Sequence, residues 1–269
     1  MQQDLSSNIS RKGTGFSILF LILSGALVAY IAYPVVNIIT IADPAILQES
    51  IARPQVGNAF LLSLATATIS TLLLAAFGIP LAYTLARYNF RGKFFIRLVI
   101  ILPLVIPPLA SGALLLGIFG PYTPIGRALP VEFTQSPLGA IIAQIYISSP
   151  FMILLAQSAF ESVNESYEKV SRVLGKSRFQ TFLQVSLPLA KTGIMAGIIM
   201  SWVRAVGELG ATMMLAYNPH TISIQIFEDN AIGGLEQTVP GILLVIILSV
   251  AVLAVFSVVK KGEGLKFGW

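Results

Sequence analysis

The sequence predicts an all-α integral membrane protein with six transmembrane helices. Of its 269 residues, 55% are hydrophobic and only 11% are charged, whereas soluble domains carry about 25% charged residues. The apolar residues gather into runs long enough to cross a bilayer. The cations gather in alternate loops between these runs, as they do in multi-pass membrane proteins.

The predicted spans form a single domain, residues 16–260, between a tail at 1–15 and a tail at 261–269. They cover about residues 16–39, 58–86, 96–119, 138–160, 189–217 and 240–259. The first run is too long for a cleaved signal peptide, whose apolar core has about 7–15 residues. Polar loops separate the spans, and the last of these loops covers 218–239.

The third predicted span contains three prolines. Pro103, Pro107 and Pro108 each lack a backbone N–H donor, so the helix must bend. A membrane tolerates such a bend where a neighbouring helix or a wet cavity satisfies the freed carbonyls. The prolines are consistent with a structural kink and equally with a role in lining or gating a pathway.

The loop between the fourth and fifth spans, residues 161–188, is basic and amphipathic. It carries Lys169, Arg172, Lys176 and Arg178, and so cannot lie in lipid. Apolar residues recur at helical spacing on both sides of Gly175, which predicts two short helices joined by a glycine turn. Taken alone, such a loop is also consistent with a surface helix that binds lipid headgroups.

This loop resembles the cytoplasmic motif of ATP-binding-cassette (ABC) importer permeases, E-A-A-x-x-x-G followed later by Leu-Pro. Gly175 and Leu187-Pro188 match, whereas 169–171 read Lys-Val-Ser and the carboxylate of Glu168 comes one residue early. The resemblance implies coupling helices that dock on a separate ATPase subunit. The residues it assigns to coupling are Glu168, Lys169, Val170, Ser171, Arg172, Leu174, Gly175, Lys176, Ser177, Phe179 and Phe182.

The chain is not expected to bind ATP or a metal itself. Gly175-Lys176-Ser177 resembles the end of a phosphate-binding loop, but Val170 stands where that loop needs a glycine. There are no cysteines and one histidine, His220, so a thiolate or histidine metal cluster is excluded. No H-E-x-x-H or G-x-S-x-G motif supports an intramembrane enzyme. We therefore expect a non-enzyme whose ATP and Mg²⁺ are held by a partner.

Two charged residues, Arg204 and Glu208, fall inside the fifth predicted span. An unpaired charge at mid-membrane costs at least about 2.5–3.5 kcal/mol, and their i, i+4 spacing allows the two to pair. The pair is either a self-neutralising structural feature or part of an anion path in which Arg204 supplies positive potential. Gly207, next to Glu208, permits close helix approach.

The loop charges predict the orientation. All 17 Lys and Arg residues except Arg53, Arg127 and the intramembrane Arg204 belong to one set of loops and tails. This asymmetry places both termini and the 161–188 loop in the cytoplasm, with the protein in the cell membrane. The net charge of +5 does not indicate nucleic-acid binding, because no aromatic-rich polar face accompanies the cations.

Residues 202–212, which read W-V-R-A-V-G-E-L-G-A-T, resemble a segment of molybdate, tungstate and sulfate permeases, as do 102–108 and 119–126. The turn at 86–93 is most similar to the molybdate and tungstate branch. The resemblance implies a type I ABC importer permease that works as a homodimer with two ATPase subunits and an external oxyanion-binding protein. The expected path or gate residues are Arg204, Glu208, Gly207, Pro107 and Pro108. A sulfate or thiosulfate importer and an ATP-independent secondary anion transporter are the alternatives.

Overall fold

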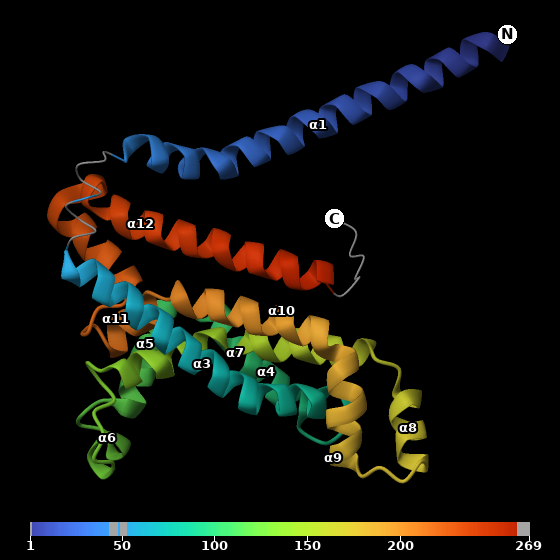
Figure 1. The fold of residues 1–269 in the computed structure, drawn as a ribbon. Helices are drawn as coiled ribbons and strands as arrows, with labels where there is room; N and C mark the ends of the chain where they lie inside the picture. The colour runs from blue at the N-terminus through green and yellow to red at the C-terminus, as the bar shows by residue number, and fades with distance from the viewer. Residues whose placement is uncertain (1, 43–47, 49–52, 263–269) are drawn as a thin grey trace.

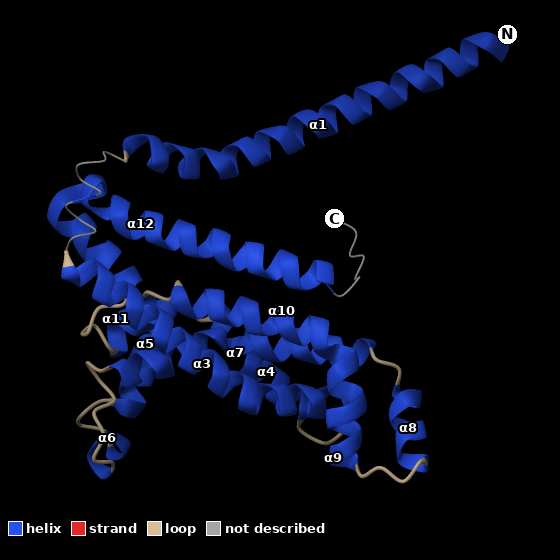
Figure 2. Ribbon diagram, in the orientation of Figure 1, coloured by secondary structure: helices blue, strands red, loops and turns tan. Residues whose placement is uncertain are grey.

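The computed structural model describes residues 2–42, 48 and 53–262, and all regular structure in this part of the chain is helical (Figure 2). Residue 1, most of the loop at 43–52 and residues 263–269 of the predicted C-terminal tail lie outside the described residues. In chain order the elements are α1 (Gln2–Ile41), α3 (Pro54–Arg87), α4 (Lys93–Val105), α5 (Pro108–Phe119), α6 (Pro124–Ala128), α7 (Pro137–Ser162), α8 (Glu165–Val173), α9 (Arg178–Thr181), a π-helix (Phe182–Ser186), α10 (Leu187–Val206), α11 (Gly210–Leu215) and α12 (Ile222–Gly262).

Five helical stretches in the described residues are long and apolar enough to cross a membrane. They lie in α1, α3, α7, the continuous helix from Arg178 to Val206, and α12. A sixth crossing is reached only if α4 and α5 together count as one broken span. The all-helical membrane fold is therefore confirmed, and the number of six spans stays a prediction.

The third span is not the single bent helix expected over 96–119. It consists of α4 and α5, whose axes differ by 117°. Ile106 and Pro107 between them have extended ψ angles of 129° and 139°, because a residue that precedes proline is disfavoured in the helical region. Since α4 has 13 residues, it is about 20 Å long, which is shorter than the roughly 30 Å of a bilayer's hydrocarbon core.

The fifth span also differs from the uninterrupted helix expected over 189–217. It begins at Arg178, so α9 continues through the π-helix into α10 instead of forming a separate short helix. The wide π-helical turn lies just before Pro188, whose ring would clash with the carbonyl four residues earlier in a regular α-helix. The span is interrupted again between Val206 and Gly210, where α11 begins.

Two segments predicted to be irregular are helical. The first helix begins at Gln2, so the described part of the 1–15 tail continues α1. The segment 218–239, expected to be a loop, lies largely in α12, which bends at Gly234 (φ 70°, ψ −162°). The bend separates a polar first part of α12 from the apolar span. The acidic residues in this segment therefore do not prevent it from being helical.

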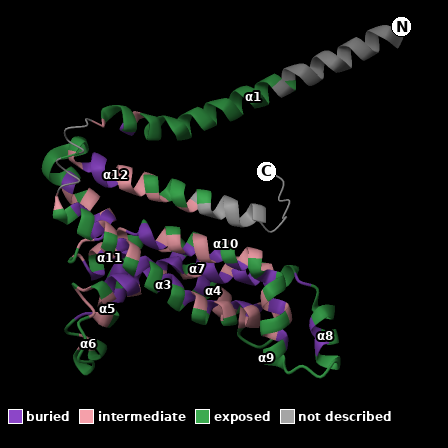
Figure 3. Cartoon of the chain, in the orientation of Figure 1, coloured by how far each residue is buried: buried purple, intermediate pink, exposed green. Residues whose placement is uncertain are grey.

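The core lies where α3, α7 and α10 pack side by side (Figures 1 and 3). Leu85, Ala156 and Phe160 are completely buried in it. A polar seam crosses this core, because Gln144 accepts a hydrogen bond from Ser70 Oγ at 3.0 Å and donates one to Thr66 Oγ1 at 3.1 Å. Such polar contacts join membrane helices in the absence of water. In contrast, α1 contacts α12 (Figure 1), and most of its apolar side chains from Phe16 onward are exposed, although Ile38 is buried.

Candidate coupling and translocation sites

The predicted site residues fall into two groups at different positions along the bundle. The coupling residues belong to α8, the turn after it, α9 and the first residue of the π-helix, Phe182, at one end of the bundle (Figure 1). The path residues lie in or next to the breaks between α4 and α5 and between α10 and α11: Pro108 begins α5, and Arg204 lies in the last turn of α10.

Local sequence signals define α8 and α9. Asn164 caps α8 by accepting from the backbone N–H of Ser166 at 2.9 Å, and Ser177 with Gln180 forms a capping box at α9. Gly175 between them has φ +88°, which a residue with a side chain adopts only with strain. A Cβ there would meet nothing within 4 Å, so the backbone conformation alone calls for glycine. The predicted glycine turn between two helical segments is confirmed.

Most of this loop is exposed. Val170, Val173, Leu174 and Phe179 are 57%, 86%, 75% and 68% exposed, beside the exposed Lys169, Arg172 and Lys176. We call these seven residues the coupling surface. Exposed apolar side chains of this size among basic residues are typical of a surface that contacts another molecule.

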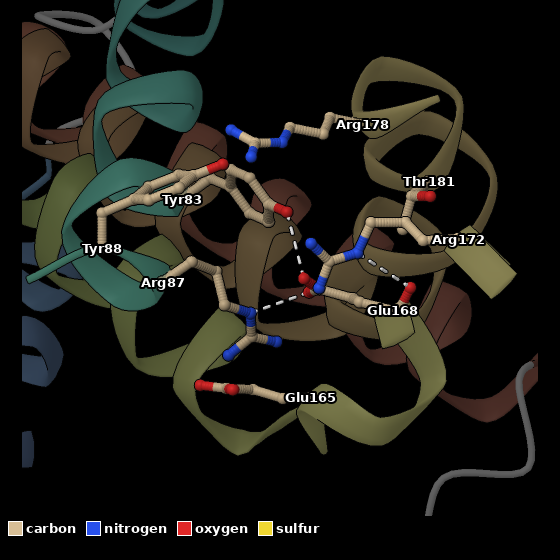
Figure 4. Close-up of a pocket in the computed structure, with 8 residues that line it drawn as sticks. All are labelled: Tyr83, Arg87, Tyr88, Glu165, Glu168, Arg172, Arg178 and Thr181. Atoms are coloured by element: carbon tan, nitrogen blue, oxygen red, sulfur yellow. Dashed lines mark hydrogen bonds and ion pairs between the residues drawn. The ribbon is translucent and has the colours of Figure 1, made fainter. Parts of the chain in front are cut away.

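Glu168 and Ser171 point the other way and are buried. The Glu168 carboxylate accepts from Arg87 Nε at 2.7 Å, Ser186 Oγ at 2.9 Å and Tyr83 OH at 3.1 Å (Figure 4). Ser171 Oγ lies 3.1 Å from Thr181 Oγ1 and so joins α8 to α9. These two residues hold the loop onto the bundle and are not available to an incoming protein.

Phe182 is half-buried and packs its ring against Tyr83 and Phe160, with centroids 4.9 and 6.0 Å apart. The exposed Lys176 contacts Gln184 through its Nζ.

Arg87 was not singled out from the sequence, where it is one of several cations in the turn at 86–93. Its carboxylate partner, Glu168, is 81 residues away, and the burial of Glu168 that requires a cation appears only in the structure.

A polar pocket opens between the end of α3 and the loop. It is lined by Tyr83, Arg87, Tyr88, Glu165, Glu168, Arg172, Arg178 and Thr181 (Figure 4). Within it, Arg172 donates back along α8 to the backbone carbonyl of Glu168, one turn earlier, at 3.4 Å. The pocket marks the seam along which the loop meets the bundle.

The intramembrane charges form the expected i, i+4 pair, with Arg204 Nη2 and Glu208 Oε2 2.5 Å apart. Glu208 lies in the break after α10, not in the middle of a helix, and is 1% exposed. Its other oxygen accepts from the backbone N–H of Ala211 at 2.8 Å, at the start of α11. The Arg204 side chain is 28% exposed. Each oxygen of the Glu208 carboxylate thus contacts a group of the protein, and the guanidinium of Arg204 is the more accessible partner of the pair.

The two helix breaks meet. A Cβ built on Gly210 would lie 2.8 Å from Pro108 Cβ and 2.9 Å from Leu109 N, so the start of α11 touches the start of α5. One turn further on, Gly112 lies against Ala211. This contact brings the break that contains Pro107 and ends at Pro108 next to the break that contains Glu208, although the residues were predicted from separate spans. Gly207 itself has no close neighbour beyond Val203 O, which a Cβ would meet at 3.6 Å.

Comparison with known proteins places these features in a family. Residues 78–261 match the family described as binding-protein-dependent transport system inner membrane component. A probable molybdenum ABC transporter permease protein of Haloferax volcanii is 40% identical over 235 residues, 87% of each chain. The molybdate/tungstate transport system permease protein of Pyrococcus abyssi is 36% identical over 244 residues, 90% of this chain and 93% of the relative.

Solved structures give the same fold. A bacterial alginate ABC transporter in complex with its alginate-bound periplasmic protein matches with a TM-score of 0.75 and 15% identity, over 91% of this chain and 94% of that chain. An inward-facing methionine ABC transporter matches with a TM-score of 0.62 and 16% identity, over 78% and 98%. The chain belongs to the family of inner-membrane components of binding-protein-dependent transport systems.

Proposed function

We propose that this chain is the permease subunit of an ABC importer that carries molybdate or tungstate into the cytoplasm. The observation that carries the proposal is that relatives named for molybdenum or for molybdate and tungstate align over 85–90% of this chain at 31–40% identity. The sulfate alternative is not favoured by these relatives. The chain is a transporter subunit and not an enzyme, and ATP is hydrolysed on a partner subunit.

The coupling surface supports a protein partner at the cytoplasmic end. Two of its exposed apolar residues, Val170 and Val173, lie on α8, whose buried residues, Glu168 and Ser171, are polar. This is the reverse of a helix that merely covers a core. An ATPase subunit with an apolar, acidic cleft would cover it. The described ends of α1 and α12 point toward the same end of the bundle as α8 (Figure 1), which supports a cytoplasmic location for both termini.

The junction of α5 and α11 is the proposed gate. Both helices start there after a break, and Arg204 offers the accessible positive charge beside it. A sparsely charged path suits an anion, because a tight cationic site would slow its release. Movement of α10 relative to α4 would separate the two breaks and open the path. We infer that two copies of the chain enclose the path as a homodimer, and that an external oxyanion-binding protein supplies the anion.

The experiment is reconstitution of this chain in proteoliposomes with its ATPase and its binding protein. We expect molybdate and tungstate uptake that requires ATP, and titration of the binding protein should show tighter binding of these anions than of sulfate. Uptake by this chain alone, driven by an ion gradient and indifferent to ATP, would instead establish a secondary transporter.

A matched pair of variants tests the docking. Leu174→Asp on the coupling surface should abolish co-purification of the ATPase. Tyr122→Asp, equally exposed at 84% but between α5 and α6, should retain it. Retention of the ATPase by both variants would show that the coupling surface is not the docking site.

A further inference from the structure

Arg87 joins three helices at the cytoplasmic end of the bundle. It is the last residue of α3, and its side chain is 7% exposed. Its Nε contacts Glu168 on α8 at 2.7 Å, and its Nη2 donates to the carbonyl of Val163, the residue that ends α7, at 2.9 Å. One guanidinium therefore fixes the end of α3, the end of α7 and the middle of α8 relative to one another.

The carboxylate that Arg87 holds is also bound from two other directions. Tyr83, one turn earlier on α3, donates to Glu168 Oε2, and Ser186 donates to Oε1 from the π-helix that leads into α10. Figure 4 shows the carboxylate enclosed between the Tyr83 and Arg87 side chains. Glu168 is thus the point at which α8 is connected to both α3 and α10.

Few other contacts attach α8 to the bundle. From residue 164 to residue 180, all residues except Glu168 and Ser171 are exposed, and Ser171 reaches only the neighbouring α9. An apolar interface would let α8 slide, because hydrophobic contact is non-directional. A buried ion pair, in contrast, is favourable only in good geometry, so α8 cannot move away from α3 without losing the contact between Glu168 and Arg87. A displacement of α8 is therefore expected to carry α3 with it.

We propose that Arg87 is a positioning residue for coupling: by holding Glu168, it transmits movement of α8 to α3 and, through Ser186, to α10. This inference rests on the proposed function, since the movement originates in the docked ATPase. Arg87 itself does not touch the ATPase or the anion. Its role is to convert a displacement of the coupling surface into a displacement of the spans that carry the gate.

The chain offers a matched control. Arg97 on α4 pairs with Glu161 on α7 in the same chemistry, but at 3.4 Å and with side chains 42% and 48% exposed. This exposed pair joins two spans without involving α8 and is screened by solvent. Arg97→Met should therefore leave coupling unchanged.

The first test uses proteoliposomes that contain the permease, its ATPase and its binding protein. Arg87→Met should keep the ATPase bound and hydrolysing ATP, while molybdate uptake per ATP falls by about fivefold or more, the lower end of measured coupling effects between sites. Arg87→Lys keeps the charge but offers a single nitrogen in place of the two that bind Glu168 and Val163, so it should restore uptake per ATP only in part. Unchanged uptake per ATP in Arg87→Met would overturn the proposal, and so would a loss that only parallels loss of the ATPase.

A double variant separates coupling from folding. Arg87→Met alone leaves a buried carboxylate unpaired, whereas Arg87→Met with Glu168→Gln removes both charges. The amide oxygen can still accept from one of the two hydroxyls of Tyr83 and Ser186, and the amide nitrogen can donate to the other. The double variant should fold as the wild type does and still couple poorly. A well-folded double variant that couples normally would overturn the proposal.

The second test does not need the ATPase, and so distinguishes failure of this inference from failure of the proposed function. The chain has no cysteine, so spin labels attach only at Val173→Cys on α8 and Asn89→Cys after α3. Mixing labelled with excess unlabelled chain isolates the distance between the two labels within one copy. Both positions are exposed. The distance distribution should be narrow in the wild type and in Arg97→Met, and broad in Arg87→Met. An equally narrow distribution in Arg87→Met would show that Arg87 does not position α8.

Discussion

Three variants separate the structural role of the Arg204–Glu208 pair from its role in transport. They are Arg204→Met, Glu208→Gln and the two together. Glu208 is 1% exposed, lies 2.5 Å from Arg204 and accepts from the Ala211 N–H at 2.8 Å. Arg204→Met removes the only cation paired with this carboxylate among the described residues. Glu208→Gln keeps an acceptor for Ala211 but removes the charge.

The magnitudes follow from burial. Arg204→Met leaves a buried charge unpaired and should cost about 3–5 kcal/mol of stability, unless the carboxyl group takes up a proton at lower cost. Glu208→Gln loses a charge-assisted contact and should cost about 1.5–3 kcal/mol. The double variant leaves neither charge unpaired, so its stability should return close to that of the wild type. Arg97→Met, in an exposed pair, should cost no more than about 1 kcal/mol.

The assays are thermal unfolding of the purified protein and ATP-driven molybdate uptake in proteoliposomes. If Arg204 attracts the anion, uptake by the double variant stays at least about tenfold below wild type, equivalent to about 1.4 kcal/mol of barrier, although stability has recovered. Recovery of uptake together with stability would refute the transport role and leave a purely structural pair. An Arg204→Met variant as stable as the wild type would refute the reasoning from burial.

Three further substitutions test other contacts. Gly175→Leu forces a residue with a side chain to adopt a φ of +88°, which costs about 1–2 kcal/mol. It should lower uptake per ATP without affecting membrane insertion. Gly92→Leu, at φ +96° in another turn, should leave uptake per ATP unchanged. Gly210→Val places a side chain against the start of α5, because its Cβ would lie 2.9 Å from the backbone nitrogen of Leu109, and should strongly reduce uptake. Gly207→Ala should not, because its Cβ would come no nearer than 3.6 Å to Val203 O. Gln144→Leu removes two hydrogen bonds between α3 and α7, but the hydroxyls of Ser70 and Thr66 keep backbone carbonyl partners at 2.6 and 2.9 Å. The thermal midpoint in detergent should therefore fall by an amount corresponding to about 0.5–1.5 kcal/mol for each lost bond.

The sequence was sufficient for the membrane class, the positions of most spans and the glycine turn, because each depends on local composition. It was not sufficient for the breaks within the third and fifth spans. Pro107 indicated a bend, but the 117° change of direction depends on how α5 packs against α11. The interruption before Gly210 contains no proline, and its stability depends on Glu208, which both neutralises Arg204 and caps α11.

The candidate coupling site was predicted only in part for a related reason. Helical spacing identified the apolar residues of the loop, and Val170, Val173, Leu174 and Phe179 are exposed, whereas Phe182 is half-buried against the bundle. Glu168 belongs to the same stretch but faces inward, because its cation comes from Arg87, 81 residues earlier in the chain. Charge counting assigned Arg87 to a basic turn, and no local pattern reveals a pairing over that separation.

The π-helix at 182–186 has a geometric consequence for the chain on either side of it. Each π-type turn accommodates one residue more than an α-helical turn, and one residue corresponds to about 100° of rotation. A helical wheel drawn at constant pitch from Arg178 to Val206 therefore misplaces the residues on one side of the π-helix by about 100° relative to those on the other side. Deletion of a single residue between Phe182 and Ser186 would restore regular pitch, and α9 would then turn by about a quarter of a circle relative to α10.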